Sequence, residues 1–416
     1  MLKNLKIKDW RQFSNVDIDF HDRLTILTGV NGSGKTTVVN VLSTLFGWQA
    51  SFPGRREDTT SASELSVDIE IGAKDIKTVL FESAWGEKNP SVYSLYQGTK
   101  PNVKLLGTSI HSNRPKLSYE RLIDIPTKAP SKAEIFKEYT NYMKTYHRDK
   151  TSSYSMGKYS RHSLEAGTDN PAMLIIKQNL VALALFGFGN AVISGNEDAK
   201  SIFESYEDLL RKILPTSLGF NKIKINSEEV MLETDTTSFP IDGVSGGISS
   251  LIDITWQIFL LCEDENHTYT VIIDEPENHL HPQLQRTIMT TLLTAFPNVQ
   301  FVIATHNPLI ITSSKDCSIY ALTYDETTES KKVRSQKLDD INLSSTSNKI
   351  LHQILGVEST IPEWVIAETK GIIAKYSELP FTIENADKME NELASIGLAE
   401  HTDHLLEKVL STDGVT

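Results

Sequence analysis

The chain has 416 residues, of which 39% are hydrophobic and 23% are charged. These proportions exclude a disordered chain, and the length suggests two or three domains. The net charge of −13 opposes binding of nucleic acid by the surface as a whole, although a local basic patch could still bind it. The two cysteines, Cys262 and Cys317, form no Cys-x-x-Cys pair, which argues against a cysteine zinc site. The first residues contain no long apolar run, so we expect a cytoplasmic protein without a membrane segment.

The first part of the chain is predicted to be mostly β-strand. Strict alternation places Val16, Ile18 and Phe20 on a buried face and the intervening aspartates in solvent. The other elements expected here are further strands within 2–28, a helix from 35 to about 46 closed by Gly47, antiparallel strands over 65–100, and loop with short strands over 101–130.

Helical segments dominate from residue 131 onward. The expected elements, in chain order, are helix over 131–214 with breaks at 146–163 and 187–196, β-like alternation over 215–242, an apolar helix over 249–263, a strand over 270–275, a helix over 282–295, a strand over 299–305, and mostly helix over 331–416 after one more strand pair.

The segment Gly29–Thr36, Gly-Val-Asn-Gly-Ser-Gly-Lys-Thr, matches G-x-x-x-x-G-K-[ST] between a predicted strand and a predicted helix. We call it the phosphate loop. Its glycines let backbone N–H groups approach phosphate oxygens, and the helix N-terminus adds partial positive charge. Lys35 is expected to reach the β- and γ-phosphates of ATP, and Thr36 to ligate Mg²⁺. The candidate nucleotide-binding residues here are Asn31, Gly32, Ser33, Gly34, Lys35, Thr36 and Thr37.

A second candidate site follows the apolar run 269–273, which is typical of a buried central strand and ends in Asp274 and Glu275. Acids at the carboxyl end of such a strand lie where open α/β sheets bind ligands. Asp274 is expected to hold Mg²⁺, and Glu275 to activate the attacking water as general base. The phosphate loop upstream favours this interpretation over acids that merely end a strand.

Two further motifs follow in an informative order. Ser245, Gly246 and Gly247 open an apolar helix upstream of Asp274, and His306 follows the buried run 301–305. A Ser-Gly-Gly turn alone is a common helix cap, and a histidine at a strand end is often an ordinary surface residue. Their position among the other motifs favours a signature loop, as we call Ser245–Gly247, and a γ-phosphate switch at His306.

This order of motifs resembles the ABC-type ATPase head of the SMC and RecF group, which includes the OLD-like ATPases of bacterial phage defence. The segment Asp274–Pro282, the segment Ala304–Pro308 and the opening Trp10–Phe13 also match. The resemblance implies an α/β P-loop fold with a mixed central sheet flanked by helices, plus a helical insertion and a helical C-terminal extension. It also implies an ATPase with Lys35, Glu275 and His306 as catalytic residues, and it places Arg11 near the nucleotide.

The sequence departs from the group in three places. The usual Leu-Ser-Gly-Gly-Gln signature has Val244 and Ile248 as its outer residues here. No glutamine clearly marks the loop that helps to bind Mg²⁺; Gln97 and the loop Asn113–Pro115 are the alternatives. No Asp-x-Asp follows His306, so we expect no nuclease in this chain.

We expect four parts in the chain. They are an ATPase lobe over 1–100, an inserted and mostly helical lobe over 101–240, a second ATPase lobe over 241–335 and a helical extension over 336–416.

The resemblance implies a sensor or regulatory ATPase of a prokaryotic defence complex, similar to Septu-type and PARIS-type systems. Such an ATPase would act on a separately encoded effector of the nuclease class. The resemblance also implies a homodimer, or a higher even oligomer, that sandwiches ATP. The main alternative is a RecF-like repair ATPase that closes on DNA. A transporter subunit and a non-hydrolysing scaffold are less favoured. Interleaved tyrosines and basic residues over 139–162 offer a surface for nucleic acid, with a solvated loop as the other interpretation.

Overall fold

The computed structural model describes residues 1–48, 50, 64–71, 74–82, 92–96, 105–114, 119, 121–122, 124–151, 171–226, 229–325, 331–338, 363–377, 379–380 and 382–395. They belong to two units, Met1–Ser347 and Asn348–Thr416, and each unit is described here by itself.

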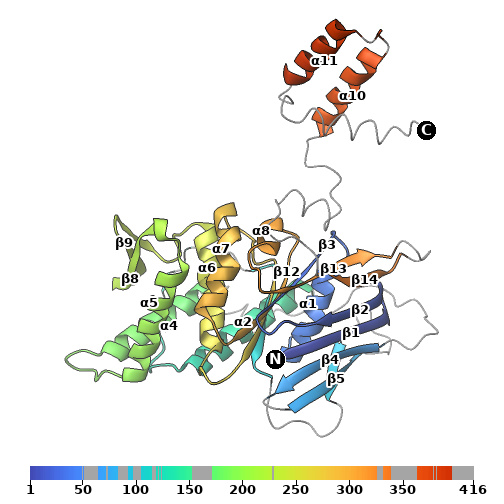
Figure 1. Ribbon diagram of the computed structural model, residues 1–416. Coiled ribbons are helices and arrows are strands. Elements are labelled where there is room, and N and C mark those ends of the chain that lie inside the picture. The colour runs from blue at the N-terminus through green and yellow to red at the C-terminus, as the bar shows by residue number, and fades with distance from the viewer. Residues whose placement is uncertain are drawn as a thin grey trace. The chain divides into compact units, whose positions relative to one another are not determined.

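The first unit is built on a mixed sheet of eleven strands within the described residues (Figure 1). Five neighbouring strands, from β13 to β7, run parallel, whereas β6, β5, β4, β1 and β2 pair antiparallel. The strands are, in order across the sheet, β6 (Val92–Tyr96), β5 (Lys74–Glu82), β4 (Glu64–Ile71), β1 (Leu2–Trp10), β2 (Phe13–Asp19), β14 (Val333–Lys337), β13 (Ser318–Tyr324), β3 (Leu24–Gly29), β12 (Val299–Ala304), β11 (Tyr269–Asp274) and β7 (Gly107–Ile110).

The burial pattern of the strands explains their places in the sheet. Every residue of β3, β11 and β12 is buried, as expected for parallel strands covered on both faces. In β2 the predicted alternation is confirmed, because Val16 and Ile18 are fully buried while the aspartates between and after them are exposed. The predicted α/β P-loop fold is therefore present.

Helices flank the central strands. The helix after the phosphate loop, α1 (Lys35–Ser43), continues into a 3₁₀ turn, Thr44–Phe46, which ends at Gly47 with φ 73°, as predicted. The long apolar helix is α6 (Gly246–Leu261), in which all fourteen residues from Ile248 to Leu261 are buried. Two further helices, α7 (Pro282–Ala295) and α8 (Pro308–Ile311), follow β11 and β12.

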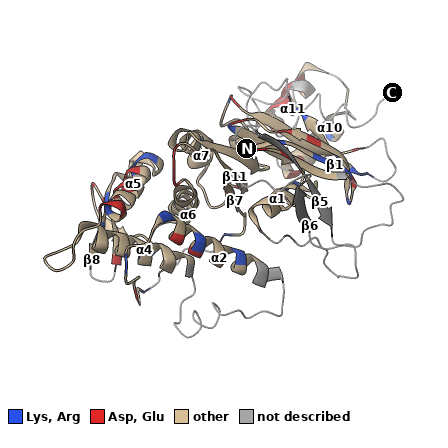
Figure 2. Ribbon diagram, turned by 90° about the horizontal axis from the view of Figure 1, so that it is seen from below, with Lys and Arg blue, Asp and Glu red and all other residues tan. Residues whose placement is uncertain are grey.

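A mostly helical region packs against α6. It contains α2 (Lys132–Thr151), α4 (Pro171–Phe188) and α5 (Glu197–Ile213), and a small sheet of β8 (Phe220–Asn226), β9 (Glu229–Thr234) and β10 (Ser238–Pro240). Tyr206 of α5 meets Trp256 of α6 edge to face at 4.7 Å between ring centroids. Acidic and basic residues are interspersed along the outer side of α5 (Figure 2). We call α4 and the sheet β8–β10 the α4–β9 lobe, since these elements contact one another directly.

The structure corrects two expectations for this region. Strand β7 belongs to the main sheet, beside β11, although residues 101–240 were expected to form an inserted lobe. Helix α2 runs on to Thr151, so the break expected from residue 146 does not begin there. The division into two units also differs from the four parts expected from the sequence.

The proposed aromatic surface for nucleic acid is wrong for its first part. Tyr139 and Tyr142 are buried in α2, at 1% and 7% exposure, and so cannot stack on bases. Tyr139 instead donates a hydrogen bond to Asp253 of α6. Lys144 donates to the Phe46 carbonyl at 3.0 Å. Residues 152–162 lie outside the described part of the chain.

Within its described residues, the second unit contains α10 (Glu363–Ser377) and α11 (Ile383–Ser395), so helix is confirmed over these ranges. The buried side chains of Val365 and Leu393 hold the two helices together, and Lys375 pairs with Glu392 at 2.9 Å. None of the helices in the described part of the chain has the length and apolarity needed to cross a bilayer.

Candidate nucleotide site

The candidate site follows from the order of four parallel strands, β3, β12, β11 and β7. Because neighbouring parallel strands end at the same edge of a sheet, the segments that follow them lie in a row. The phosphate loop follows β3, His306 follows β12, Asp274 and Glu275 end β11, and Ser112 follows β7. Motifs far apart in the sequence therefore meet at one edge.

The phosphate loop has the backbone that its glycines allow. Gly32 and Gly34 have φ values of 83° and 93°, which other residues rarely adopt. A Cβ on Gly34 would lie 2.6 Å from the Phe13 ring, so no larger residue fits there. The Lys35 ammonium donates to the carbonyls of Gly29 at 2.8 Å and Val30 at 3.1 Å, and burial lowers its pKa. A buried cation held by loop carbonyls fits the phosphates of a nucleotide.

Thr36 and Asp274 are brought together, as predicted for a shared metal site. The Thr36 hydroxyl donates to Oδ2 of Asp274 at 3.1 Å. Burial, with a smaller contribution from the nearby Glu275, raises the pKa of Asp274 to about 6, although hydrogen bonds from Thr36 and Ser112 act in the opposite direction. Hydroxyl and carboxylate oxygens are the donors that Mg²⁺ prefers, so this pair fits the metal.

Glu275 is held in a conformation that costs energy. Its φ is 50°, in the left-handed region that non-glycine residues seldom adopt. The Asn278 amide donates to its Oε2 at 3.0 Å, and Nδ1 of His306 lies 3.5 Å from its Oε1. The two predicted catalytic side chains therefore lie next to each other, each partly exposed.

Asn278 is a site residue that the motif reading did not single out, although it lies within the matched segment. Its amide also donates to the Ser112 carbonyl at 3.3 Å, and its own carbonyl accepts from Ser250 at 3.3 Å and from Arg114 at 3.4 Å. Asn278 thus links Glu275 to the loop after β7 and to the first turns of α6.

Arg114 brings a buried cation next to this network. It is 7% exposed, and its Nε and Nη1 have no hydrogen-bond partner among the described residues. Burial lowers its pKa, while Asp253, Glu277 and the Asp274–Glu275 pair act in the opposite direction. Arg114 therefore compensates part of the negative charge behind the site. The alternative residue, Gln97, lies outside the described residues.

The signature loop presents its first two residues to solvent. Ser245 and Gly246 are exposed, and the Ser245 side chain makes no cap hydrogen bond. A Cβ on Gly247 would lie 3.1 Å from the His279 carbonyl, so the loop packs closely on the segment after β11. Its exposed edge is free to meet another surface.

The turn between β1 and β2 lies against the phosphate loop. The Gln12 amide makes one contact here, since it donates to the Thr37 hydroxyl at 3.4 Å. The Arg11 guanidinium lies over the Trp10 ring, 5.3 Å from its centroid. Tyr324, at the end of β13, lies close to Gly32, since its hydroxyl is 3.4 Å from the position of a Cβ there. Gln12 lies within the matched opening Trp10–Phe13 but was not singled out, and Tyr324 lies in no motif.

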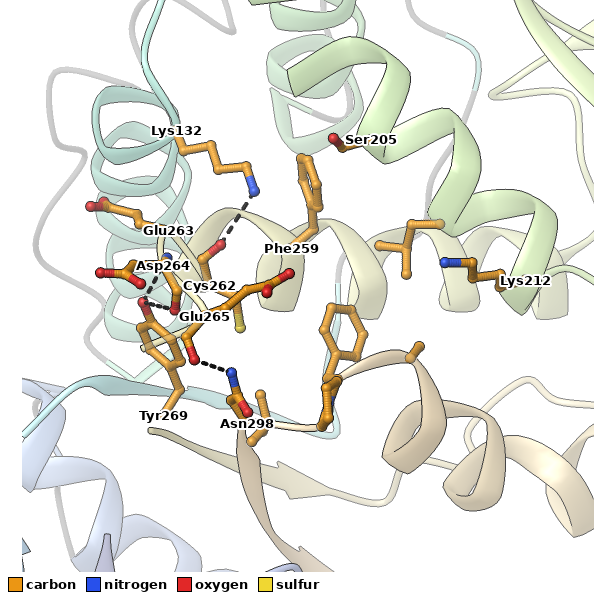
Figure 3. A pocket seen from close by; sticks show the side chains of 15 residues that line it. Lys132, Ser205, Lys212, Phe259, Cys262, Glu263, Asp264, Glu265, Tyr269 and Asn298 are labelled. Carbon is orange, nitrogen blue, oxygen red and sulfur yellow. Dashed lines mark hydrogen bonds between the residues drawn. The ribbon is translucent and has the colours of Figure 1, made fainter. Parts of the chain in front are cut away.

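A hollow of about 320 Å³ lies at the other end of the central strands (Figure 3). Tyr269 and Val299, the first residues of β11 and β12, contribute to its wall, whereas the nucleotide site is at the last residues of these strands. The Lys132 side chain enters it from α2, over the Phe259 ring, and donates to the Cys262 carbonyl. This hollow is therefore separate from the candidate nucleotide site.

Comparison with known proteins decides the family. Residues 24–312 match the family described as "AAA domain, putative AbiEii toxin, Type IV TA system". The chain belongs to this AAA family. The match runs from β3 to α8 and so includes the phosphate loop, the signature loop, Asp274, Glu275 and His306. Membership implies ATP binding.

Named relatives agree with the family. The chain is 21% identical to "Septu protein PtuA" of Bacillus thuringiensis over 424 residues, covering 99% of this chain and 96% of that protein. It is 22% identical to "Retron Vc95 probable ATPase" of Vibrio cholerae serotype O1 biovar El Tor, covering 75% and 71%. Among solved structures, it matches the "SMC head domain from Thermotoga maritima" with 13% identity and a TM-score of 0.43, covering 81% and 99%. The expected relationship to Septu ATPases is confirmed.

The raised pKa of Asp274 predicts that Asp274→Asn stabilises the protein without nucleotide or metal. The folded-state pKa of about 6 exceeds the ordinary 3.8, so ionisation of Asp274 opposes folding. The resulting loss of folding free energy reaches its full size above about pH 6. We expect the variant to gain about 1–3 kcal/mol in urea unfolding at pH 8, and a gain that shrinks as the pH falls toward 4. Asp22→Asn, on an exposed side chain, is the matched control. If Asp274→Asn and the wild type are equally stable at pH 8, the interpretation that a buried, ionised Asp274 destabilises the fold is wrong.

The contacts of Asn278 predict that Asn278→Ala lowers kcat for ATP hydrolysis about tenfold or more, because Glu275 loses the hydrogen bond that orients it. The KM for ATP should change little, since Asn278 is not among the phosphate-loop residues. Steady-state kinetics measures both. Asn298→Ala is the control, because Asn298 lies at the start of β12, away from the site. A change in KM alone would show that Asn278 does not orient the base.

Proposed function

We propose that this chain binds ATP with Mg²⁺ and hydrolyses it, as the sensor or regulatory subunit of a prokaryotic defence complex whose effector is a separately encoded nuclease. The observation that carries the ATPase part is the convergence of Lys35, Thr36, Asp274, Glu275 and His306 at one edge of the sheet.

Each residue has a role that its position supports. Lys35 exchanges its bonds to the loop carbonyls for bonds to the β- and γ-phosphates. Thr36 and Asp274 would hold Mg²⁺, which when bound offsets phosphate charge. Glu275 orients the attacking water and takes its proton, with Asn278 fixing the carboxylate. His306, beside Glu275, is placed to sense the γ-phosphate.

The exposed signature loop supports a two-fold arrangement. Ser245 and Gly246 are available to a second copy of the chain, where they would meet the γ-phosphate held by Lys35 of that copy. Exchange of the same two patches is isologous and closes as a dimer. Bound ATP then favours the dimer by mass action, and hydrolysis loosens it. The nucleotide state can in this way be reported to a partner.

The defence role rests on the similarity to the Septu protein and to the retron ATPase. The alternative, a RecF-like ATPase that closes on DNA, loses one of its supports, because Tyr139 and Tyr142 are buried. Co-purification from the native operon, with sequencing of the neighbouring genes, tests the partner. Recovery of the chain without any partner would contradict the complex.

Glu275→Gln should bind ATP but hydrolyse it about 10²–10⁴-fold more slowly, because the amide keeps the size of the side chain and loses its basicity. The variant should accumulate in the ATP-bound dimer. Titration calorimetry measures binding, phosphate release measures turnover, and Glu263→Gln, on the exposed loop before β11, is the control. Turnover at the wild-type rate would mean that another group activates the water.

Mixing two inactive variants tests the arrangement across the dimer. Lys35→Ala removes the charge opposite the phosphates, and Ser245→Arg blocks the signature loop. A mixed dimer holds one composite site with both changes and one with neither, so about a quarter of the wild-type activity should return after random mixing. Differently tagged chains show whether mixed dimers form. Mixed dimers without activity would rule out independent sites shared between two chains.

A further inference from the structure

Helix α4 carries one charged residue, Lys177, and the side chain of Lys177 is completely buried. Its ammonium lies 2.8 Å from Oδ2 of Asp242, whose side chain is also fully buried, and 3.1 Å from Oε2 of Glu229. A fully buried ion pair is unusual, because the free energy needed to remove both charges from water often exceeds the attraction between them.

The lysine joins segments from four places in the sequence. Glu229 is the first residue of β9, and Asp242 lies in the turn after β10, where Gly243 N donates to the Pro240 carbonyl. Tyr119 completes the group: its hydroxyl donates to Oε1 of Glu229 at 2.7 Å, and its ring centroid lies 5.1 Å from the Lys177 ammonium. The α4–β9 lobe is thereby fixed to the turn that contains Asp242.

That turn leads directly into the signature loop. Asp242 precedes Ser245 by three residues, and the exposed Ser245 has no side-chain cap bond of its own. Asp242 is therefore the buried anchor of the loop on its N-terminal side. On the other side, Ser250 of α6 donates to the Asn278 carbonyl, and Asn278 holds Glu275.

A pair of this kind is better at fixing a geometry than at adding stability. Replacing a buried ion pair by apolar residues is often neutral or stabilising, whereas removing one partner leaves an unpaired buried charge. The Lys177–Asp242 pair therefore has one clear consequence, which is that the turn before the signature loop has a single position relative to α4.

We propose that Lys177 is a positioning residue for ATP hydrolysis. Its pair with Asp242 holds the signature loop where it meets the nucleotide of a second chain, and it transmits any displacement of the α4–β9 lobe to that loop. The proposal rests on the proposed function, because it requires the signature loop to act in hydrolysis. A partner that moves α4 would then change the rate of ATP turnover.

The test compares Lys177→Met, Asp242→Asn, the double variant and Glu229→Gln, with Lys200→Met as control for the loss of an exposed pair on α5. The readouts are thermal unfolding, ATP affinity by calorimetry, and kcat with KM. The single variants at Lys177 and Asp242 should lower the unfolding temperature and reduce kcat about 5- to 150-fold, with ATP affinity nearly unchanged. The control should match the wild type.

The double variant separates positioning from folding. It contains no unpaired buried charge, so its unfolding temperature should return toward that of the wild type, while kcat stays low because the turn is no longer fixed. Glu229→Gln leaves the Lys177–Asp242 pair intact and should therefore keep kcat near the wild-type value. If the double variant does not fold, the folded single variants at Lys177 and Asp242 decide the test.

Wild-type kcat in the folded double variant, or in a folded single variant at Lys177 or Asp242, would overturn the proposal. Ser245→Arg distinguishes this failure from failure of the proposed function. If Ser245→Arg abolishes hydrolysis while the double variant is fully active, the signature loop acts but Lys177 does not position it. If Ser245→Arg is itself fully active, the proposed function is wrong.

Discussion

Parallel pairing of β3, β12, β11 and β7 is the constraint on which the site depends. Each strand alone is a short and mostly buried run, and each is followed by residues that could serve many purposes. Once the strands pair in this order, their carboxyl ends place a lysine, two acids, a histidine and a serine at one edge. The register Asp274 to Ala304 brings the acid pair beside the segment that carries His306. Packing of apolar strands, with no contribution from the polar groups, therefore determines where the polar groups meet.

The polar groups so assembled are costly to hold without a ligand. Asp274 and Glu277 are nearly buried, at 2% and 6% exposure, and burial raises the pKa of both. Their partners in the chain are largely neutral: the hydroxyls of Thr36 and Thr305. Arg114 supplies a cation from behind, but its own burial lowers its pKa. A site with more acid than cation gains most from a bound metal ion, so the same arrangement that lowers stability favours binding.

The sequence predicted the parts of this site that are local and missed those that depend on pairing. The phosphate loop, the acid pair and His306 each follow an apolar strand, and the helix bounds 282–295 were correct to the residue. Short strands were expected within 101–130, but the place of β7 in the main sheet was not predicted, because β7 has four residues, two of them the polar Thr108 and Ser109, which are buried. For the same reason Ser112, which follows β7 and forms a hydrogen bond with Asp274, was not predicted as a site residue. Tyr139 was misjudged because a tyrosine among lysines looks the same in sequence whether its hydroxyl meets solvent or Asp253.

Asn278 connects the first turns of α6 to Glu275 through hydrogen bonds. Its side-chain amide donates to Glu275. Its carbonyl accepts from Ser250, which lies three residues after the signature loop. If the signature loop meets a nucleotide in a second chain, as we propose, a displacement of α6 would move Ser250 and hence Asn278, which holds Glu275. Assembly and hydrolysis would then be coupled through two hydrogen bonds, without a large rearrangement of the sheet. Since each bond is worth only about 1 kcal/mol, a modest displacement of α6 is sufficient to change the alignment of Glu275.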